Sequence, residues 1–232
     1  MGKRANGLRL LLWFLLGLGA LHAARGAAEE APSSRWEPAI QRFEASDRSS
    51  PPAPGGVVFV GSSSIRLWTT LIEDFPGVNV INRGFGGSEL SDAIEFVGRI
   101  VLPYRPRMVV LYAGDNDLAR GKTPERVLQD TRAFVERVQR EQPQARIVFV
   151  SIKPSLARAA LLQVSEEANR LVREYAAERS GLEFVDVVAP MLDREGRPRA
   201  ELFIDDGLHM NEQGYALWRA ALAPFVEARP EP

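Results

Sequence analysis

Five short apolar runs, separated by segments with helical periodicity, constrain the fold of this chain more than any other feature. The runs lie at residues 57–60, 78–81, 107–112, 146–152 and 182–187, and each has the length of a buried strand. Apolar residues with helical spacing follow at 88–102, from 123 onward, at 159–179 and at 211–228. Strands that alternate with helices predict an α/β fold in which helices cover both faces of a parallel sheet.

The composition narrows the classes of function. The chain has 232 residues and a formal net charge of -1, from 29 Lys and Arg against 30 Asp and Glu. Domains that bind nucleic acid are usually clearly basic, so no nucleic-acid partner is expected. The sequence contains no cysteine, which excludes disulfides, thiol catalysis and thiolate metal sites. Two histidines, His22 and His209, are too few for a histidine-rich zinc site.

The first 28 residues have the order of an export signal. Basic residues at 3, 4 and 9 precede an apolar run at 10–21, and small residues follow up to position 28. We predict a signal peptide at 1–28 and an exported protein, periplasmic or extracellular, with no stable membrane insertion after cleavage. An uncleaved N-terminal membrane anchor is the alternative. Cleavage would leave His209 as the only histidine of the mature protein.

Residues 29–56 are rich in Pro, Ser and Ala. We expect them to form an N-terminal extension, with a short helix at 36–43 and an extended loop at 49–56. The main domain is expected to span residues 57–228.

The first predicted strand ends in a glycine and three serines, Gly61 to Ser64, before a helical segment begins. Side chains at this point lie at the carboxyl edge of the sheet, where open α/β sheets bind ligands. A serine here could act as a nucleophile whose oxyanion meets the backbone N–H groups of the following helix. Serine is also a favoured helix N-cap, so a purely structural role stays open on this stretch alone.

Polar connections also follow the second and third predicted strands. Residues 82–88 contain three glycines, which would let the backbone approach a ligand closely; the alternative is a flexible turn. Residues 113–117 place the amide of Asn116 between two carboxylates. The alternatives there are a simple turn or a divalent-cation site, although the spacing of a calcium loop is missing.

An aspartate precedes a histidine by three residues in the connection before the last helix, at Asp206 and His209. An aspartate so placed can accept the Nδ1 proton of the ring, which fixes the tautomer and stabilises the imidazolium formed when Nε2 takes a proton from serine. A lone histidine is also common as a surface or structural residue. Taken together, the four connections supply a nucleophile, oxyanion donors, a base and its orienting carboxylate, which acyl transfer requires.

The four connections resemble the sequence blocks of the SGNH hydrolases, also called GDSL-type esterases or lipases. Residues 61–63, 82–87, 114–117 and 206–209 resemble, in order, the G-D-S, N-x-G-x-x-G, G-x-N-D and D-x-x-H blocks of that family. The resemblance covers residues 57 to about 225. It implies a flavodoxin-like three-layer α/β/α sandwich with a mostly five-stranded parallel sheet, and it implies no metal and no organic cofactor.

The resemblance also implies the role of each matching residue. Ser63 corresponds to the nucleophile, His209 to the general base and Asp206 to the carboxylate that orients it. The oxyanion hole would be formed by the backbone N–H groups of Ser63 and Gly87 and by the side-chain amide of Asn116.

Two positions depart from the family pattern. Ser62 stands where the family usually has Asp, and Ser88 stands where Asp often follows the glycines. The local hydrogen bonds must therefore differ. Because three serines adjoin, Ser62 and Ser64 stay open as alternative nucleophiles.

The function implied is the hydrolysis of an acyl ester through a serine triad. Two alternatives are an acyltransferase that uses the same residues and a catalytically silent ligand-binding domain of the cell envelope. No long apolar insertion suggests a lipid tunnel, so we expect a small-molecule or carbohydrate ester with a short acyl group such as acetyl. The sequence carries no signal for an oligomeric state. Side chains expected near the pocket are Arg66, Trp68, Arg83, Phe85, Asp117 and Lys153.

Overall fold

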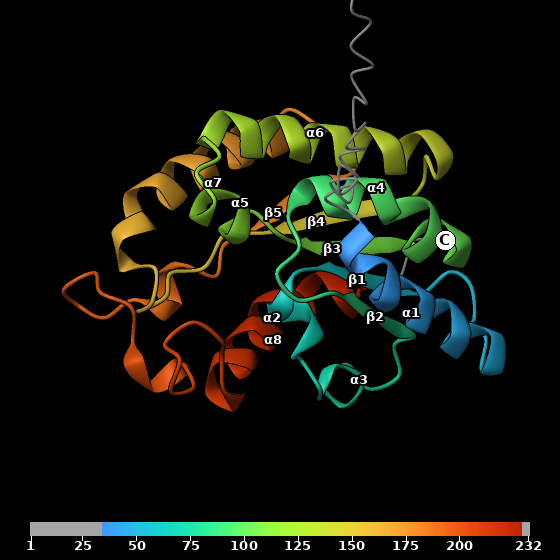
Figure 1. Ribbon diagram of the computed structural model, residues 1–232, viewed down its shortest axis with the longest axis horizontal. Helices are drawn as coiled ribbons and strands as arrows, with labels where there is room; N and C mark the ends of the chain where they lie inside the picture. Colours follow the sequence, from blue (N-terminus) through green and yellow to red (C-terminus); the bar gives the residue numbers. More distant parts are fainter. Residues whose placement is uncertain (1–33, 229–232) are drawn as a thin grey trace, which may run out of the picture. The chain divides into compact units, whose positions relative to one another are not determined.

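A five-stranded parallel sheet lies between two layers of helices in the computed structural model, which describes residues 34–228 (Figure 1). The strands are β1 (Val57–Gly61), β2 (Val80–Gly84), β3 (Met108–Tyr112), β4 (Arg146–Val150) and β5 (Leu182–Val185). Their order in the sheet is β2-β1-β3-β4-β5, so the direction of winding reverses between β1 and β3. Ligands of open α/β sheets bind at such a switch point, beside the carboxyl ends of the strands. The predicted flavodoxin-like α/β/α fold is confirmed.

Side chains of each strand alternate between the two helical layers, as the pleat of a strand requires. In β1, Val58 and Val60 pack into one core cluster, and Val57 and Phe59 pack into the other. The first cluster includes residues of α1, α4, α6 and α7, and the second includes residues of α2, α3 and α8. The helices are α1 (Glu37–Ser49), α2 (Ser63–Arg66), α3 (Leu71–Asp74), α4 (Leu90–Ile100), α5 (Asp115–Ala119), α6 (Pro124–Glu141), α7 (Leu162–Ala177) and α8 (Glu212–Val226).

Five short 3₁₀ turns complete the regular elements of the described residues. They are η1 (Ser34–Trp36), η2 (Leu102–Tyr104), η3 (Ala159–Leu161), η4 (Ala189–Met191) and η5 (Ala200–Leu202). No helix within residues 34–228 is long and apolar enough to cross a membrane. The predicted signal peptide at 1–28 lies outside the described residues.

Strand β2 begins and ends later than the sequence pattern predicts. Its parallel register with β1 pairs Val57 with Val80 and continues to Gly61 opposite Gly84. The polar residues Asn82 and Arg83 are therefore part of the strand and not of the connection after it. Backbone pairing with a neighbour, which the sequence pattern does not show, extends this strand past its last apolar residue.

Helix α1 is longer than the predicted helix at 36–43, because interactions along its whole length hold it on the sandwich. Ile40 is fully buried in the core. Arg99 of α4 donates hydrogen bonds to both Glu37 and Glu44, at 2.7–2.9 Å. Charge-assisted bonds of this fork geometry fix the relative position of two helices well.

Candidate active site

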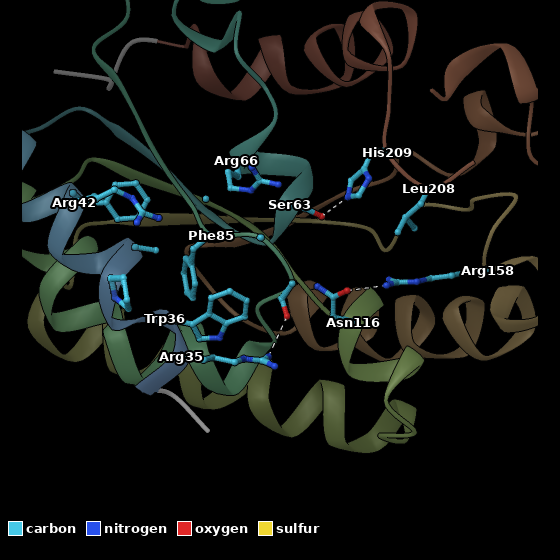
Figure 2. A pocket seen from close by; sticks show the side chains of 16 residues that line it. Arg35, Trp36, Arg42, Ser63, Arg66, Phe85, Asn116, Arg158, Leu208 and His209 are labelled. Carbon is cyan, nitrogen blue, oxygen red and sulfur yellow. Dashed lines mark hydrogen bonds between the residues drawn. The ribbon is translucent and has the colours of Figure 1, made fainter. Parts of the chain in front are cut away.

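Three side chains from distant parts of the chain meet at the carboxyl edge of the sheet. Ser63 is the first residue of α2, directly after β1, and Asp206 and His209 lie in the loop before α8. His209 Nε2 is 2.9 Å from Ser63 Oγ (Figure 2), and His209 Nδ1 is 2.5 Å from Asp206 Oδ2. A serine hydroxyl on one ring nitrogen and a carboxylate on the other is the arrangement by which a serine is deprotonated for attack.

The loop that carries Asp206 and His209 is organised by the carboxylate itself. Asp206 Oδ1 accepts hydrogen bonds from the backbone N–H groups of Leu208 and His209, both at 2.9 Å, and Gly207 makes the turn with φ +62°. Partial burial raises the pKa of Asp206, but the hydrogen bonds from the backbone and ring of His209 outweigh it and lower the pKa to about 2. Asp206 is therefore a carboxylate throughout the pH range in which proteins are normally assayed.

A buried lysine also holds this loop in place. Lys153 follows β4, is 4% exposed, and donates a hydrogen bond of 2.7 Å from Nζ to the carbonyl of Leu208. Burial lowers the pKa of Lys153 to about 8. The sequence predicts that this residue lines the pocket, and its position after a central strand is the only signal. The structure instead places it behind the loop, where it holds the residue next to His209.

Of the three adjoining serines, Ser63 is the one whose hydroxyl meets His209. Ser62 and Ser64 are buried, at 0% and 2% exposure, and the carbonyl of Ser64 accepts a hydrogen bond from the Tyr215 hydroxyl at 2.9 Å. Residues one position apart on a helix turn point in different directions, so only one serine of the run can face the histidine.

Gly61 allows the serine turn to form. Its φ is +137°, and a Cβ at this position would lie 1.8 Å from the carbonyl oxygen of Tyr112 in β3. The backbone of Ser62 uses that carbonyl instead, through a hydrogen bond of 3.1 Å from its N–H. A larger residue at position 61 would push β1 and β3 apart at the point where the strand turns into α2.

The two departures from the family pattern, Ser62 and Ser88, are both buried. Neither hydroxyl has a hydrogen-bond partner within residues 34–228. An unpartnered buried hydroxyl costs free energy, although far less than an unpaired buried carboxylate would. The substitutions therefore change the hydrogen bonding behind the site without touching the contacts among Ser63, His209 and Asp206.

Gly87 and Asn116, two of the expected oxyanion donors, line the same cavity as Ser63. Gly87 lines the same cavity with φ +79°, a backbone conformation that favours glycine. Asn116 is held at both ends of its amide: Nδ2 donates to the carbonyl of Ser88 at 2.9 Å, and Oδ1 accepts from Arg158 Nη2 at 2.8 Å. Because a guanidinium can only donate, it fixes the amide with its oxygen toward Arg158. The second Nδ2 hydrogen is then left for a ligand.

The two carboxylates beside Asn116 are buried in ion pairs. Asp115 Oδ2 lies 3.0 Å from Arg158 Nη1. Asp117 is fully buried, accepts hydrogen bonds from the backbone N–H of Leu90 and from Lys122, and has its pKa raised by burial. Asp117 therefore ties α5 to the start of α4. Within residues 34–228, no group of three or more His, Asp or Glu side chains is arranged to hold a metal ion.

A cavity of about 660 Å³ opens at Ser63 and His209 (Figure 2). Of the side chains expected near the pocket, Arg66 and Phe85 line it. The other four do not: Trp68 belongs to the core, Arg83 is buried against Asp47, and Asp117 and Lys153 lie behind the loops. The contribution of η1 and α1 is not predicted from the sequence, because the composition of this segment indicates only an N-terminal extension. Their lining residues are Arg35, Trp36, Pro38, Ala39, Arg42 and Phe43.

Comparisons with known proteins support this fold and give the family of the chain. The GDSL-like Lipase/Acylhydrolase family matches residues 55–217 of the chain. The platelet-activating factor acetylhydrolase IB subunit alpha1 of Pongo abelii is 29% identical over 191 residues, which cover 78% of this chain and 78% of that protein.

Two solved structures show the same fold. A Streptococcus pneumonia protein named for platelet activating factor has a TM-score of 0.74 at 22% identity, over 83% of this chain and 94% of that chain. A variant of an acetyl xylan esterase from Geobacillus stearothermophilus has a TM-score of 0.60 at 15% identity, over 78% of this chain and 98% of that chain.

Proposed function

Because the chain belongs to the GDSL-like lipase/acylhydrolase family and is therefore a carboxylic ester hydrolase, we propose that it cleaves a short-chain acyl ester. In this proposal Ser63 is the nucleophile, His209 is the general base and Asp206 is the carboxylate that orients His209. The observation that carries the proposal is the unbroken set of contacts from Asp206 through the ring of His209 to Ser63 Oγ, at 2.5 and 2.9 Å. These contacts lie beside a cavity that can admit the ester.

The reaction proceeds in two steps. Ser63 Oγ attacks the ester carbonyl while His209 Nε2 takes its proton, and the negative charge that develops meets the backbone N–H groups of Ser63 and Gly87 and the Asn116 amide. The C–O bond to the alcohol then breaks, and His209 returns the proton to the leaving oxygen. Water next attacks the acyl-enzyme with His209 as base, which releases the acid and restores Ser63.

We propose that the acyl group of the ester is small, such as acetyl. The relative from Pongo abelii is named an acetylhydrolase, and the Geobacillus structure is named an acetyl xylan esterase, both of which support a short chain. The charged side chains around the mouth of the cavity also disfavour a long hydrocarbon chain, because it would remain against arginines and water.

Aryl esters of increasing acyl length test this proposal. We expect the acetyl ester to be turned over fastest, and the Ser63→Ala protein to lose roughly 10³-fold or more in kcat, because nucleophile and base act as one unit. Ser62→Ala and Ser64→Ala are matched controls in the same turn and are expected to keep most of the activity. Full activity of Ser63→Ala, or loss only in Ser62→Ala or Ser64→Ala, would contradict the assignment.

We further propose that the protein acts outside the cytoplasm. The basic, apolar and small-residue order of the first 28 residues supports export with cleavage of a signal. Mass spectrometry of the protein recovered from the producing cells checks this: an intact Met1 in the membrane fraction would support the anchor alternative instead.

A further inference from the structure

One wall of the cavity comes from a part of the chain that the family match does not include. The match to the family model begins at residue 55, whereas η1 and α1 occupy residues 34–49. Trp36 packs edge-on against Phe85 with ring centroids 5.7 Å apart, which fixes the start of this wall against the connection after β2. The shape and charge of this side of the cavity are therefore set by residues outside the range that the family model matches.

The cavity is strongly cationic. No Asp or Glu lines it within the described part of the chain, whereas four guanidinium groups do. Cavities walled by protein concentrate the field of such charges and raise the local concentration of anions. The four are Arg35, Arg42, Arg66 and Arg158.

Two of these arginines have their charge compensated by carboxylates behind the cavity wall. Arg158 lies 3.0 Å from Asp115 and also orients Asn116. Arg35 lies 4.0 Å from Glu89 and 3.9 Å from Asp92 and stacks over Trp36. The guanidinium groups of Arg158 and Arg35 are therefore already paired with carboxylates of the protein.

Arg42 and Arg66 are different. Across residues 34–228, neither has a carboxylate within 4.0 Å, and no hydrogen bond from either guanidinium to another residue is found. Asp206, the charged residue of the triad, is hydrogen-bonded to His209 and to the loop backbone. Both side chains are exposed, both line the cavity, and within residues 34–228 neither guanidinium has a protein partner for its hydrogen-bond donors.

Arg66 is placed close to the reacting serine. It lies three residues after Ser63 in α2, a spacing that puts two side chains on the same side of a helix. Its guanidinium lies against the backbone of Gly86, where a Cβ would come within 2.6 Å of Arg66 Nε. Figure 2 shows Arg66 between Ser63 and Arg42 in that view.

We propose that the ester cleaved at Ser63 carries an anionic group, a carboxylate or a phosphate, which binds Arg66 and Arg42. The inference rests on the proposed function and adds the chemical class of the substrate to it. Guanidinium groups bind either anion through paired, charge-assisted hydrogen bonds. Phe43 and Trp36, which are partly exposed in the same cavity, can pack against the apolar part of the molecule that joins the anion to the ester.

Matched pairs of acetyl esters test the proposal on the full-length protein. One pair is 4-acetoxybenzoate against its neutral methyl ester, and the other is O-acetylglycerol phosphate against O-acetylglycerol. We expect kcat/KM for the anionic member to exceed that for the neutral member by about tenfold or more, and salt to reduce the ratio. The pair with the larger ratio identifies carboxylate or phosphate as the group recognised.

Arginine variants then locate the site. Arg66→Gln and Arg42→Gln are each expected to lower the anionic-to-neutral ratio about fivefold, and the double variant is expected to bring it close to one. Arg48→Gln on α1 is the matched control, because Arg48 is exposed and does not line the cavity, and it should leave the ratio unchanged. A wild-type ratio near one, with neutral esters still hydrolysed, overturns this inference and leaves the proposed function standing.

A binding measurement decides the inference even if no ester is turned over. Calorimetry on the Ser63→Ala protein measures binding to the anion site directly. Glycerol phosphate is compared with glycerol as its neutral reference, and 4-hydroxybenzoate is compared with its methyl ester. Saturable binding of an anion that is lost in Arg42→Gln and Arg66→Gln backgrounds supports the proposal. Binding that is absent for both anions, or equal for charged and neutral partners, overturns it.

Discussion

At the scale of single residues, proton transfer from Ser63 to His209 depends on the charge states of His209 and Asp206. The pKa of Asp206 is lowered to about 2, so this group does not titrate where the enzyme would be assayed. A protonated imidazole cannot accept the proton of Ser63. Any acidic loss of activity should therefore come from the histidine and not from the aspartate.

We predict that kcat/KM rises with pH along a single ionisation and then stays level. His209→Ala should cost about as much as Ser63→Ala, and the double variant should be little worse than either, because the two residues act together. Asp206→Asn should lower kcat by roughly 10²–10⁴-fold, since an amide favours the wrong ring tautomer. Steady-state kinetics of these variants from pH 5 to 9 make the measurement.

A His209→Ala protein that kept most of its turnover, with an unchanged pH profile, would contradict the role of His209 as the base for Ser63. Asp205→Asn is a matched control, because this neighbouring carboxylate is exposed and makes no hydrogen bond to the ring of His209.

At the scale of elements, α1 is joined to the sandwich by a second buried contact besides its bonds to Arg99. Asp47 near the end of α1 accepts a hydrogen bond of 2.5 Å from Arg83 of β2 and one from the hydroxyl of Tyr104. Arg83 is 7% exposed. Burial, together with the Asp47 carboxylate, raises the pKa of Tyr104 to about 12, so the hydroxyl stays a donor.

We predict that Asp47→Ala lowers the free energy of unfolding by about 3 kcal/mol, because it leaves the buried Arg83 without its counter-charge. The same change should raise KM for the ester, since α1 forms one wall of the cavity. Urea denaturation and steady-state kinetics measure the two effects. Arg48→Ala on the same helix is the control, and an Asp47→Ala protein as stable as this control would show that the contact contributes little.

At the scale of the whole molecule, Lys153 links the stability of the fold to pH. Burial lowers the pKa of this lysine from its ordinary value near 10.5 to about 8, with Asp115 opposing the shift and Arg158 adding to it. Between these two values the unfolded chain binds a proton at Lys153 that the folded chain does not. The unfolded state then holds more protons, so this residue makes the free energy of unfolding rise with pH in that interval.

We predict that the stability of the wild-type protein increases relative to Lys153→Met by about 2 kcal/mol between pH 7.5 and pH 9.5, since one pKa unit corresponds to about 1.4 kcal/mol. Urea denaturation of both proteins at several pH values gives the difference, in which the titration of other groups cancels. A difference that is constant over this interval, or one that falls, would contradict the burial of a titrating amine.

The sequence by itself determined the α/β class, the order of the elements and the edge of the sheet at which the polar connections lie. Apolar periodicity is a local property, and the carboxyl ends of parallel strands must share one edge, so these features follow from patterns of a few residues. The residues that the resemblance singled out, such as Ser63 and His209, are accordingly found together, although 146 positions separate them.

Three features are visible only in the tertiary structure. They are the choice of Ser63 as the serine that faces His209, the position of Lys153 behind the loop, and the contribution of Arg42 and the rest of α1 to the cavity wall. Each of these depends on the rotation of a helix turn, on burial, or on packing between segments far apart in the chain, none of which leaves a periodic signal in the sequence. Strand β2 shows the same limit, because Asn82 and Arg83 are polar yet become strand residues through pairing with β1. Contacts between distant segments depend on the shape and charge of the whole packed core, so they become visible only when the chain is folded.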